Sequence, residues 1–305
     1  MVSRAFVVLG LLAAAGLPAE AKLVVFIPGP PSHGFGSHEH RAGCLLLAKA
    51  LNEGVAGLRA IVATKKQAAG LLPKAAAVVI DCDGGAVGFL GSLADQVDAL
   101  ARRGGGVACF HYSLVTPKGP QAQRMLRWIG GYYETHWSVN PTWEADFKAL
   151  PEHPITRGVR PFRIRDEWYY HMRFVQAMKG VTPILTAVPP DSTRKRPFGP
   201  HSGNPAVRAR MGMPEHVAWA YERPGGGRGL GFTGAHFHWN WAHDDFRTLV
   251  LNAIVWIAGL EIPASGVRSK TPTLDDLLAN LDEPKPGNWN PRPIARLLER
   301  WKSRR

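Results

Sequence analysis

The amino-acid sequence predicts a three-layer αβα fold, in which helices cover both faces of a doubly wound, mostly parallel sheet. Short apolar runs alternate with amphipathic segments from Lys22 onward. The apolar runs have the length of buried strands and end at Pro, Gly or Asp. The amphipathic segments have the spacing of helices that cover one face of a sheet. Repetition of this strand–helix alternation predicts βαβ units and therefore a parallel sheet.

The first half of the chain carries the clearest elements. The run "LVVFI" at 23–27 ends in Pro-Gly, as expected for a buried parallel strand. Apolar side chains at Cys44, Leu47, Ala48 and Leu51 then follow the i, i+3, i+4, i+7 spacing of a helix. The same criteria predict further strands at 58–63, 76–85 and 106–111 and a helix at 90–103.

The second half is richer in aromatic residues and Pro-rich turns. Strands are predicted at 182–188, 216–223 and 229–241, followed by a strongly periodic helix between 246 and 257. The polar segment 189–215 is too long for a simple connection, so we expect it to be functional or mobile.

The ends of the chain differ from this pattern. Arg4 precedes an apolar run and a small-x-small site ending at Ala21, which predicts a signal peptide over 1–21 and export to the periplasm or extracellular space. The run is too short to span a bilayer, so we expect no integral membrane association. We expect one domain over 22–262 and a tail over 263–305, with a short basic helix near 293–303.

The formal net charge of +13 comes from 37 Lys and Arg against 24 Asp and Glu. Nucleic acid is not the expected partner, because export argues against it and the positive charge is widely spread. A basic surface of this kind favours contact with anionic envelope material. The three cysteines are too few for a disulfide framework, so we expect buried thiols.

Histidines and carboxylates follow the predicted strands where those strands end. In a doubly wound sheet, ligands bind outside the carboxyl ends of the strands. Segments distant in sequence therefore deliver these side chains to one edge, as in a metal site or a general acid/base site. The residues concerned are His33, His38, Glu39, His40, Asp81, Asp83, His111, His236 and His238.

Four motifs resemble the ThuA-like (trehalose-utilisation) family: "SHGFGSHEHRAG", "CFHYSLVTPKG", "HPITRGV…RDEWYYHMRF" and "GFTGAHFHWNW". The resemblance extends from about Leu23 to Ala258. It implies a flavodoxin-like fold of the class I glutamine amidotransferase-like superfamily. It also implies that the family's characteristic polar positions are His38, His111, Glu167 and His236.

Amidotransferases of this superfamily carry a cysteine nucleophile on the tight turn where this chain has His111. Cys109 lies two residues earlier, within the predicted strand, and has no base beside it in sequence. Because a cysteine nucleophile needs a neighbouring base to form its thiolate, we expect no glutaminase activity.

The resemblance and the site composition together predict a protein that processes a sugar or an oxidised (keto) sugar. Aromatic rings stack on the C–H faces of sugars, while imidazoles and carboxylates bind the hydroxyls. Oxidation next to a C–H bond lowers the pKa of that bond, so acid/base or metal-assisted isomerisation, elimination or hydrolysis is expected. The competing interpretation is a carbohydrate-binding module without catalysis. The residues expected to bind a small carbohydrate are His33, Trp137, Tyr170, His238 and Trp239.

We expect His38, His111 and His236 to hold a divalent ion, zinc above all, because neutral imidazoles suit late divalent metals. Glu167 is a further ligand or the base. His33, His40 and His238 would fix the tautomers of the ligands. The candidate catalytic residues are His111, Glu167, His40 and Asp83, whereas Asp166 has an equally good interpretation as an ion-pair partner of Arg163 or Arg165.

Overall fold

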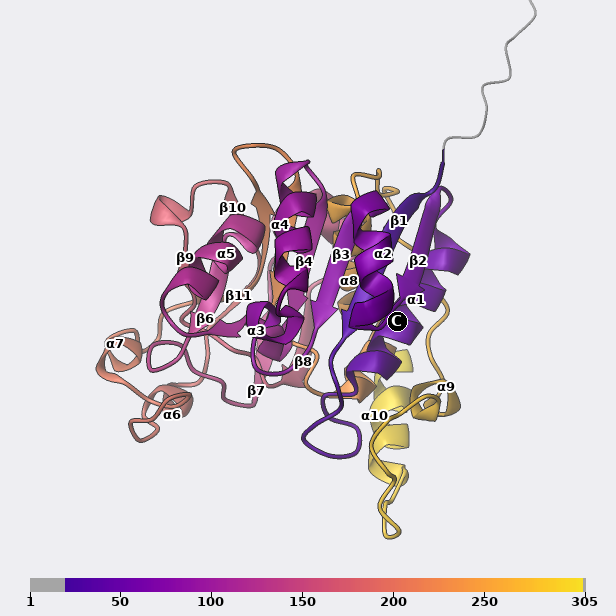
Figure 1. Cartoon of the computed structure of the whole chain (residues 1–305). Coiled ribbons are helices and arrows are strands. Elements are labelled where there is room, and N and C mark those ends of the chain that lie inside the picture. The colour runs from indigo at the N-terminus through magenta and orange to yellow at the C-terminus, as the bar shows by residue number, and fades with distance from the viewer. Residues whose placement is uncertain (1–19, 304–305) are drawn as a thin grey trace, which may run out of the picture.

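The structure, a computed structural model, describes residues 20–303 and is built around a seven-stranded sheet (Figure 1). The strand order is β10-β11-β12-β4-β3-β1-β2. The strands that run parallel are β1 (Lys22–Pro28), β2 (Leu58–Val62), β3 (Ala77–Asp81), β4 (Gly106–Phe110) and β12 (Arg228–Phe232). Polar residues that follow β1, β3, β4 and β12 therefore meet beyond the same edge of the sheet.

Two antiparallel strands extend the sheet beyond β12. β11 (Glu215–Glu222) pairs antiparallel with β12, and β10 (Val181–Ala187) pairs antiparallel with β11. The predicted fold class is confirmed, since the sheet is mostly parallel and helices lie on both sides of it.

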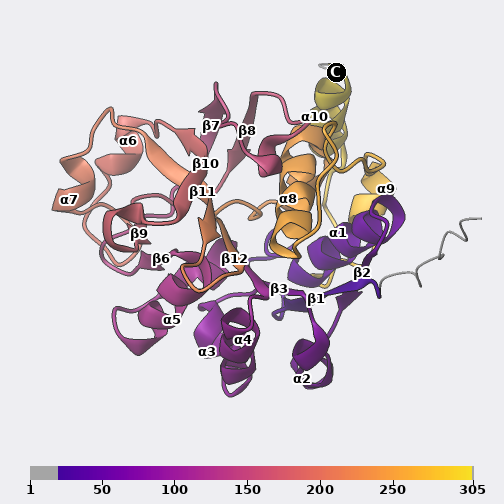
Figure 2. The same ribbon diagram turned by 90° about the horizontal axis from the view of Figure 1, so that it is seen from above.

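Helices cover the two faces in turn (Figure 2). α1 (His40–Gly54) and α8 (Asp244–Ile257) lie on one face, where Leu47, Leu51 and Leu249 join a fully buried core. α2 (Lys65–Leu71), α3 (Ala86–Leu90), α4 (Leu93–Arg102) and α5 (Pro120–Ile129) lie on the other face. α1 connects β1 to β2 and α2 connects β2 to β3 on opposite faces, so the winding reverses beside β1.

One predicted strand was wrong in its extent. The strand expected over 229–241 ends at Phe232, and the chain then forms a loop before a 3₁₀ helix at His238–Ala242. The reason is that "FHWNW" packs as a buried turn under α8 rather than pairing with another strand. His236 consequently lies in the loop, free of the alternation that a strand would impose.

The aromatic segments between α5 and β10 form small sheets beside the main one. β5 (Val115–Thr116), β6 (Gly131–Glu134) and β9 (Arg173–Phe174) make one, and β7 (Trp143–Phe147) and β8 (Phe162–Asp166) make an antiparallel pair. The β7–β8 pair ends at Asp166, directly before Glu167, and thereby brings this carboxylate to the edge of the main sheet.

The segment 189–215 contains two short helices, α6 (Asp191–Arg194) and α7 (Pro205–Arg208). The buried Arg194 guanidinium donates to Glu215 at 2.9 Å and holds both ends of the segment together. The backbone amides of His136 and Asn140 donate to Pro200 and His201, at 2.7 and 3.2 Å. These bonds pin the segment beside β6.

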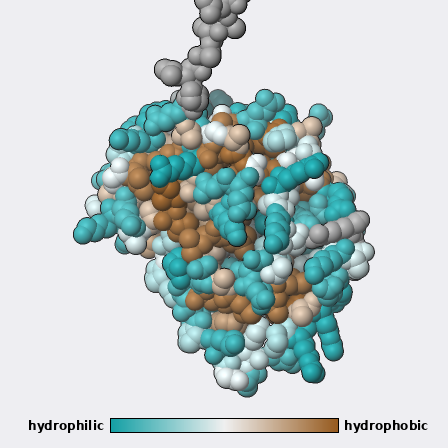
Figure 3. Space-filling model, turned by 90° about the vertical axis from the view of Figure 1, so that its right-hand side faces the viewer, coloured by the Kyte–Doolittle hydropathy of each residue, from teal (hydrophilic) through white to brown (hydrophobic). Residues whose placement is uncertain are grey.

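The tail packs against the domain through α9 (Leu274–Leu278) and α10 (Arg292–Lys302). Leu277 and Leu298 are buried, and Trp289 stacks on Trp239 with ring centroids 6.1 Å apart. Seen from the side, the surface shows separate apolar patches among hydrophilic side chains (Figure 3).

Most of the predicted signal peptide, residues 1–19, lies outside the described residues. Within residues 20–303, no helix is both long and apolar enough to cross a bilayer.

Candidate functional site

Three imidazoles and one carboxylate converge beyond the carboxyl ends of the sheet strands. His38 lies in the loop after β1, His111 directly follows β4, His236 follows β12 and Glu167 follows β8. One donor atom from each side chain lies within 4.8 Å of the others. Four distant segments thus supply a single cluster, which we call the histidine cluster.

The donor atoms of the histidine cluster are close together. The Nε2 atom of His38 lies 3.0 Å from Nε2 of His111 and 2.9 Å from Nδ1 of His236, and the last two atoms are 3.3 Å apart. The Glu167 carboxylate lies 3.4 Å from Nε2 of His111 and 3.2 Å from Nδ1 of His236. These separations are too short for uncharged groups whose lone pairs face one another.

Hydrogen bonds on the far side of the His111 and His38 rings determine which nitrogen of each ring carries the proton. The His111 Nδ1–H donates to the Thr233 carbonyl at 2.7 Å, and the His38 Nδ1–H donates to Asp83 at 2.6 Å. In the neutral form, both Nε2 atoms therefore carry a lone pair that points into the cluster. Lone pairs directed at one point suit a cation or a shared proton, and the Tyr169 hydroxyl lies 3.1 Å from Nε2 of His111 as a further donor.

The protonation states favour a cation over protons. Burial lowers the pKa of His38 to about 3, despite the nearby Asp83 carboxylate, so this ring is neutral at pH 7. Burial alone would raise the pKa of Glu167, but the neighbouring His111 and His236 side chains hold it well below its usual range. A neutral imidazole beside an ionised carboxylate is the donor state that a divalent metal needs.

The donor spacing fits a metal ion. Four donors at about 2.0–2.1 Å from one zinc ion in a tetrahedron lie about 3.3 Å from one another. Five of the six donor–donor separations run from 2.9 to 3.4 Å, and the sixth, between His38 and Glu167, is within 4.8 Å. Three imidazoles with one carboxylate also match the nitrogen and oxygen preferences of zinc and neighbouring divalent ions.

The backbone holds two of the histidines in an unusual conformation. His38 has φ of 49° and His111 has φ of 48°, in the left-handed region that non-glycine residues seldom adopt. Such strain persists only where the surrounding structure enforces it, and it concentrates at functional sites.

Gly36, with φ of 81°, lies so close to Trp239 that a Cβ would approach the indole within 2.4 Å. The loop after β1 is thereby pressed against the 3₁₀ helix.

Asp83 and His40 form a charged layer behind His38. The buried His40 ring donates to Asp81 at 2.8 Å and lies 3.3 Å from Asp83. Burial alone would lower the pKa of His40, but the two aspartates raise it to about 10. His40 and Asp83 were expected to be catalytic; the structure instead places His40 behind the cluster, where it positions Asp83 and through it His38.

Asp166 organises the loop that carries His236. Its carboxylate accepts hydrogen bonds from the backbone N–H groups of Glu167 and Ala235, both at 2.8 Å, and of His236 at 3.1 Å. The Asn240 side chain donates to it at 3.0 Å. Asp166 therefore serves this loop rather than pairing with Arg163 or Arg165, and it fixes the approach of His236.

The family model described as trehalose utilisation, ThuA, matches residues 34–257.

The chain belongs to the ThuA family.

Two solved ThuA-like structures share the fold of this chain. A ThuA-like protein from Bacteroides uniformis aligns with a TM-score of 0.56 at 15% identity, over 80% of this chain and 94% of that one. A ThuA-like protein from Parabacteroides merdae aligns with a TM-score of 0.52 at 14% identity, over 85% and 99% of the two chains. The search of curated proteins finds no match. ThuA proteins have a glutamine amidotransferase-like fold, as the resemblance implied.

The superfamily's cysteine nucleophile has no counterpart in this ThuA protein. Cys109 is fully buried within β4, and burial raises the pKa of its thiol. His111 takes the strained turn instead. Cys44 and Cys82 are buried and free as well, which confirms that the cysteines are core residues.

Sequence reasoning missed the aromatic side of the ThuA site. The Tyr169 hydroxyl lies 3.1 Å from Nε2 of His111, and its ring lies 5.2 Å from that of Tyr133. Tyr133 in turn bonds His201 of the segment 189–215 at 3.0 Å. Tyr112 faces His38 and His201, with ring centroids 6.2 and 6.3 Å away. The signal for Tyr169 was its place two residues after Glu167.

Among the five predicted carbohydrate-binding residues, only His33 lies beside the cluster. Its half-exposed ring lies 3.8 Å from that of His38 and contacts Tyr112. His33, His38 and Asp83 also form a second group of metal-type donors, but Asp83 is occupied by the His38 Nδ1–H.

The structure places the other four residues away from the cluster. The buried Tyr170 bonds Thr193 at 2.8 Å, because consecutive residues of an extended chain point in opposite directions and Tyr169 takes the cluster side. Trp137 lies between His171 and Arg173, and Trp239 lies under Trp289. His238 is buried beside α9, so it neither fixes a ligand tautomer nor reaches solvent.

Proposed function

We propose that this ThuA-family protein binds a divalent metal, zinc above all, at His38, His111, His236 and Glu167. The observation that carries the proposal is the convergence of three imidazole nitrogens and a carboxylate oxygen: all four atoms lie within 4.8 Å of one another, and every pair except His38–Glu167 is 2.9–3.4 Å apart. We further propose that the site processes a sugar or keto-sugar. The bound ion would polarise a substrate carbonyl or activate water.

The chain's own residues would supply the acid/base chemistry. Glu167 and His236 are the members of the cluster open to solvent, with 19% and 14% of their side chains exposed. Where the three imidazoles alone hold the ion, the Glu167 carboxylate is free to act as the base, and with a keto-sugar it would take the proton from the carbon beside the carbonyl. The C–H electron pair then moves toward the carbonyl oxygen, as isomerisation or elimination requires.

A polar and aromatic rim supports the assignment of a sugar. His33, Tyr112 and His201 are partly exposed around the cluster and offer imidazole nitrogens and a phenol to hydroxyl groups. Their rings also present flat faces for the C–H side of a pyranose. The family name, trehalose utilisation, is consistent with a disaccharide or its oxidised form.

Two related proposals concern what the protein does not do and where it acts. The buried Cys109 thiol and the histidine at the turn support the loss of glutaminase activity. The charge and apolar pattern of residues 1–21 supports export.

The test combines metal analysis with turnover. Protein purified without chelator should contain close to one zinc ion per chain, and it should convert a keto-disaccharide in a product assay. His111→Ala should abolish metal retention and lower kcat by orders of magnitude. His216→Ala is the matched control, because His216 bonds Thr186 rather than any member of the cluster.

Each outcome decides between two functions. Metal retention with turnover that depends on His111 supports the enzyme. Sugar binding without turnover, weakened only modestly by His111→Ala, would identify a carbohydrate-binding module instead. Absence of metal in every preparation and after zinc titration would overturn the metal proposal and leave the cluster as an acid/base site.

A further inference from the structure

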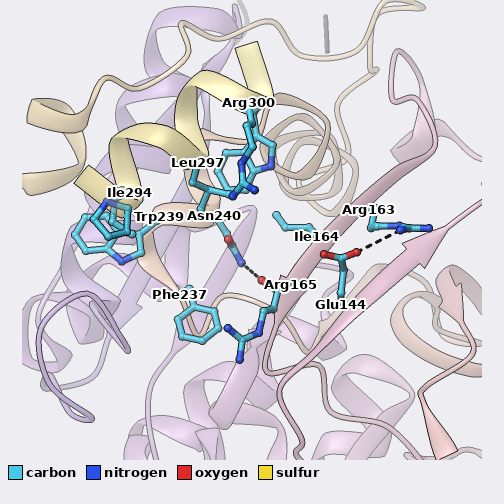
Figure 4. A pocket seen from close by; sticks show the side chains of 12 residues that line it. Glu144, Arg163, Ile164, Arg165, Phe237, Trp239, Asn240, Ile294, Leu297 and Arg300 are labelled. Carbon is cyan, nitrogen blue, oxygen red and sulfur yellow. Dashed lines mark hydrogen bonds and ion pairs between the residues drawn. The ribbon is translucent and has the colours of Figure 1, made fainter. Parts of the chain in front are cut away.

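A separate cavity of about 600 Å³ lies between the β7–β8 pair, the 3₁₀ helix at His238–Ala242 and α10 (Figure 4). Its volume is within the range of ligand pockets, which is about 300–1,000 Å³. None of the four residues of the histidine cluster lines it. The cavity is therefore a distinct site, and its walls come from the tail as well as from the domain.

One wall of the cavity is apolar. Ile294, Leu297 and Trp301 line it from α10, and Ile164 and Phe237 line it from the domain. Phe237, Leu297 and Trp301 are only partly buried. The described part of the chain thus leaves aromatic and aliphatic surface facing a concave space. Binding of an apolar group there is favourable, because it removes apolar surface from water.

The polar groups of the cavity are mainly guanidinium groups. Arg163 is neutralised by Asp146 and Glu144, at 2.8 and 3.4 Å. Arg165 and Arg300 also line the cavity, and neither forms an ion pair with any acid in residues 20–303. In Figure 4 their side chains extend from β8 and α10 on either side of Asn240. The cavity therefore carries two uncompensated positive charges next to an apolar wall.

We propose that this cavity binds an amphipathic organic anion. The aromatic or alkyl body of the ligand would pack on Phe237, Leu297 and Trp301, and its carboxylate or sulfonate would pair with the guanidinium group of Arg165 or of Arg300. Guanidinium groups suit this role because their planar N–H donors match the oxygens of such anions. A neutral ligand would leave both charges uncompensated, and a fully polar anion would leave the apolar wall in water.

The cavity shares a wall with the loop of the histidine cluster. Asn240 lines the cavity and donates to both the Arg165 carbonyl and the Asp166 carboxylate, each at 3.0 Å. Asp166 in turn holds the backbone of His236. The proposed site goes beyond the proposed function and does not depend on it, because none of its ligand contacts involves a metal donor.

The experiment titrates purified protein with 2-naphthoate and with neutral 2-naphthamide, read by calorimetry and by tryptophan fluorescence. The double variant Arg165→Gln/Arg300→Gln should weaken naphthoate binding about tenfold or more, the effect of losing charge-assisted hydrogen bonds. Naphthamide should bind wild-type protein at least about fivefold more weakly than naphthoate. The matched control is Arg292→Gln/Arg296→Gln, which removes two exposed charges of α10 that do not line the cavity.

The control should bind naphthoate within about twofold of wild type, since exposed charges that do not touch a ligand contribute little. His111→Ala should also leave naphthoate binding unchanged, which separates this result from the test of the metal site. Equal weakening in both double variants would reduce the effect to net charge and overturn the proposal. Absence of naphthoate binding at millimolar concentration would overturn it too. Thermal melting verifies that each variant is folded.

Discussion

Asp83→Asn tests the metal site without touching a proposed ligand. The Asp83 carboxylate accepts the His38 Nδ1–H at 2.6 Å and also lies 3.3 Å from the His40 ring. Although burial alone would raise the pKa of the Asp83 carboxyl, hydrogen bonds from His38, His40 and Ser32 hold it well below its usual range. The ionised carboxylate therefore fixes the His38 tautomer and makes Nε2 a stronger donor.

An asparagine keeps the size of the side chain and one acceptor oxygen but removes the charge. Loss of such a partner typically lowers metal affinity by about 10–100-fold, or about 1.4–2.7 kcal/mol. We expect the upper half of this range, because the hydrogen bond is short and His38 is buried. The zinc dissociation constant is measured by competition with a chromophoric chelator at pH 7.

The control is Asp95→Asn, which removes a largely exposed carboxylate on α4 that pairs with Arg124. Zinc affinity should stay within about twofold of wild type in this variant. If Asp83→Asn binds zinc as tightly as wild type, the assignment of Asp83 as the residue that orients His38 is refuted. An equal loss in both variants would show that the effect reflects overall charge.

Three further predictions concern stability. Asp166→Ala should lower the free energy of unfolding by at least about 3 kcal/mol in urea titrations, because the backbone amides of Glu167, Ala235 and His236 lose their acceptor; a loss below about 1 kcal/mol would contradict this role. Burial lowers the pKa of His243 to about 4 from 6.5, so the unfolded state binds more protons as pH falls from 6.5 toward 4. His243 should therefore contribute a loss of stability over that window, about 2.5 kcal/mol at pH 4.5, and His243→Asn, which keeps an acceptor for the N-cap bond, should reduce the fall by that share. Removal of metal by a chelator should lower the melting temperature and zinc should restore it, since an ion that binds only folded protein stabilises it; His111→Ala should show no such response.

The sequence by itself determined the layered fold and the location of the site. Apolar runs and amphipathic stripes are local patterns, and they define strands and helices whatever lies elsewhere in the chain. Because parallel strands place their carboxyl ends at one edge, the polar residues toward the ends of the strands predicted over 23–27, 106–111 and 229–241 were expected to meet. That is why His38, His111 and His236 could be named together although up to 198 residues separate them.

Other residues of the site depended on directions that sequence does not encode. Tyr169 and Tyr170 are adjacent and chemically identical, yet one contacts His111 and the other bonds Thr193. Which of the two tyrosines faces His111 depends on the orientation of the chain where it leaves β8 at the edge of the sheet. His40 similarly begins α1, so its ring turns toward Asp81 and away from the ligands of the cluster.

Long-range packing decided the rest. His238 is buried because α9 packs against the 3₁₀ helix that carries it. The cavity lined by Arg165 and Arg300 exists because α10 lies over the β7–β8 pair. The segment 189–215 brings His201 to Tyr133 through backbone bonds to residues 136 and 140. Burial, pKa and pocket shape all result from contacts between segments far apart in the chain, and a local pattern carries no information on which distant surface will cover it.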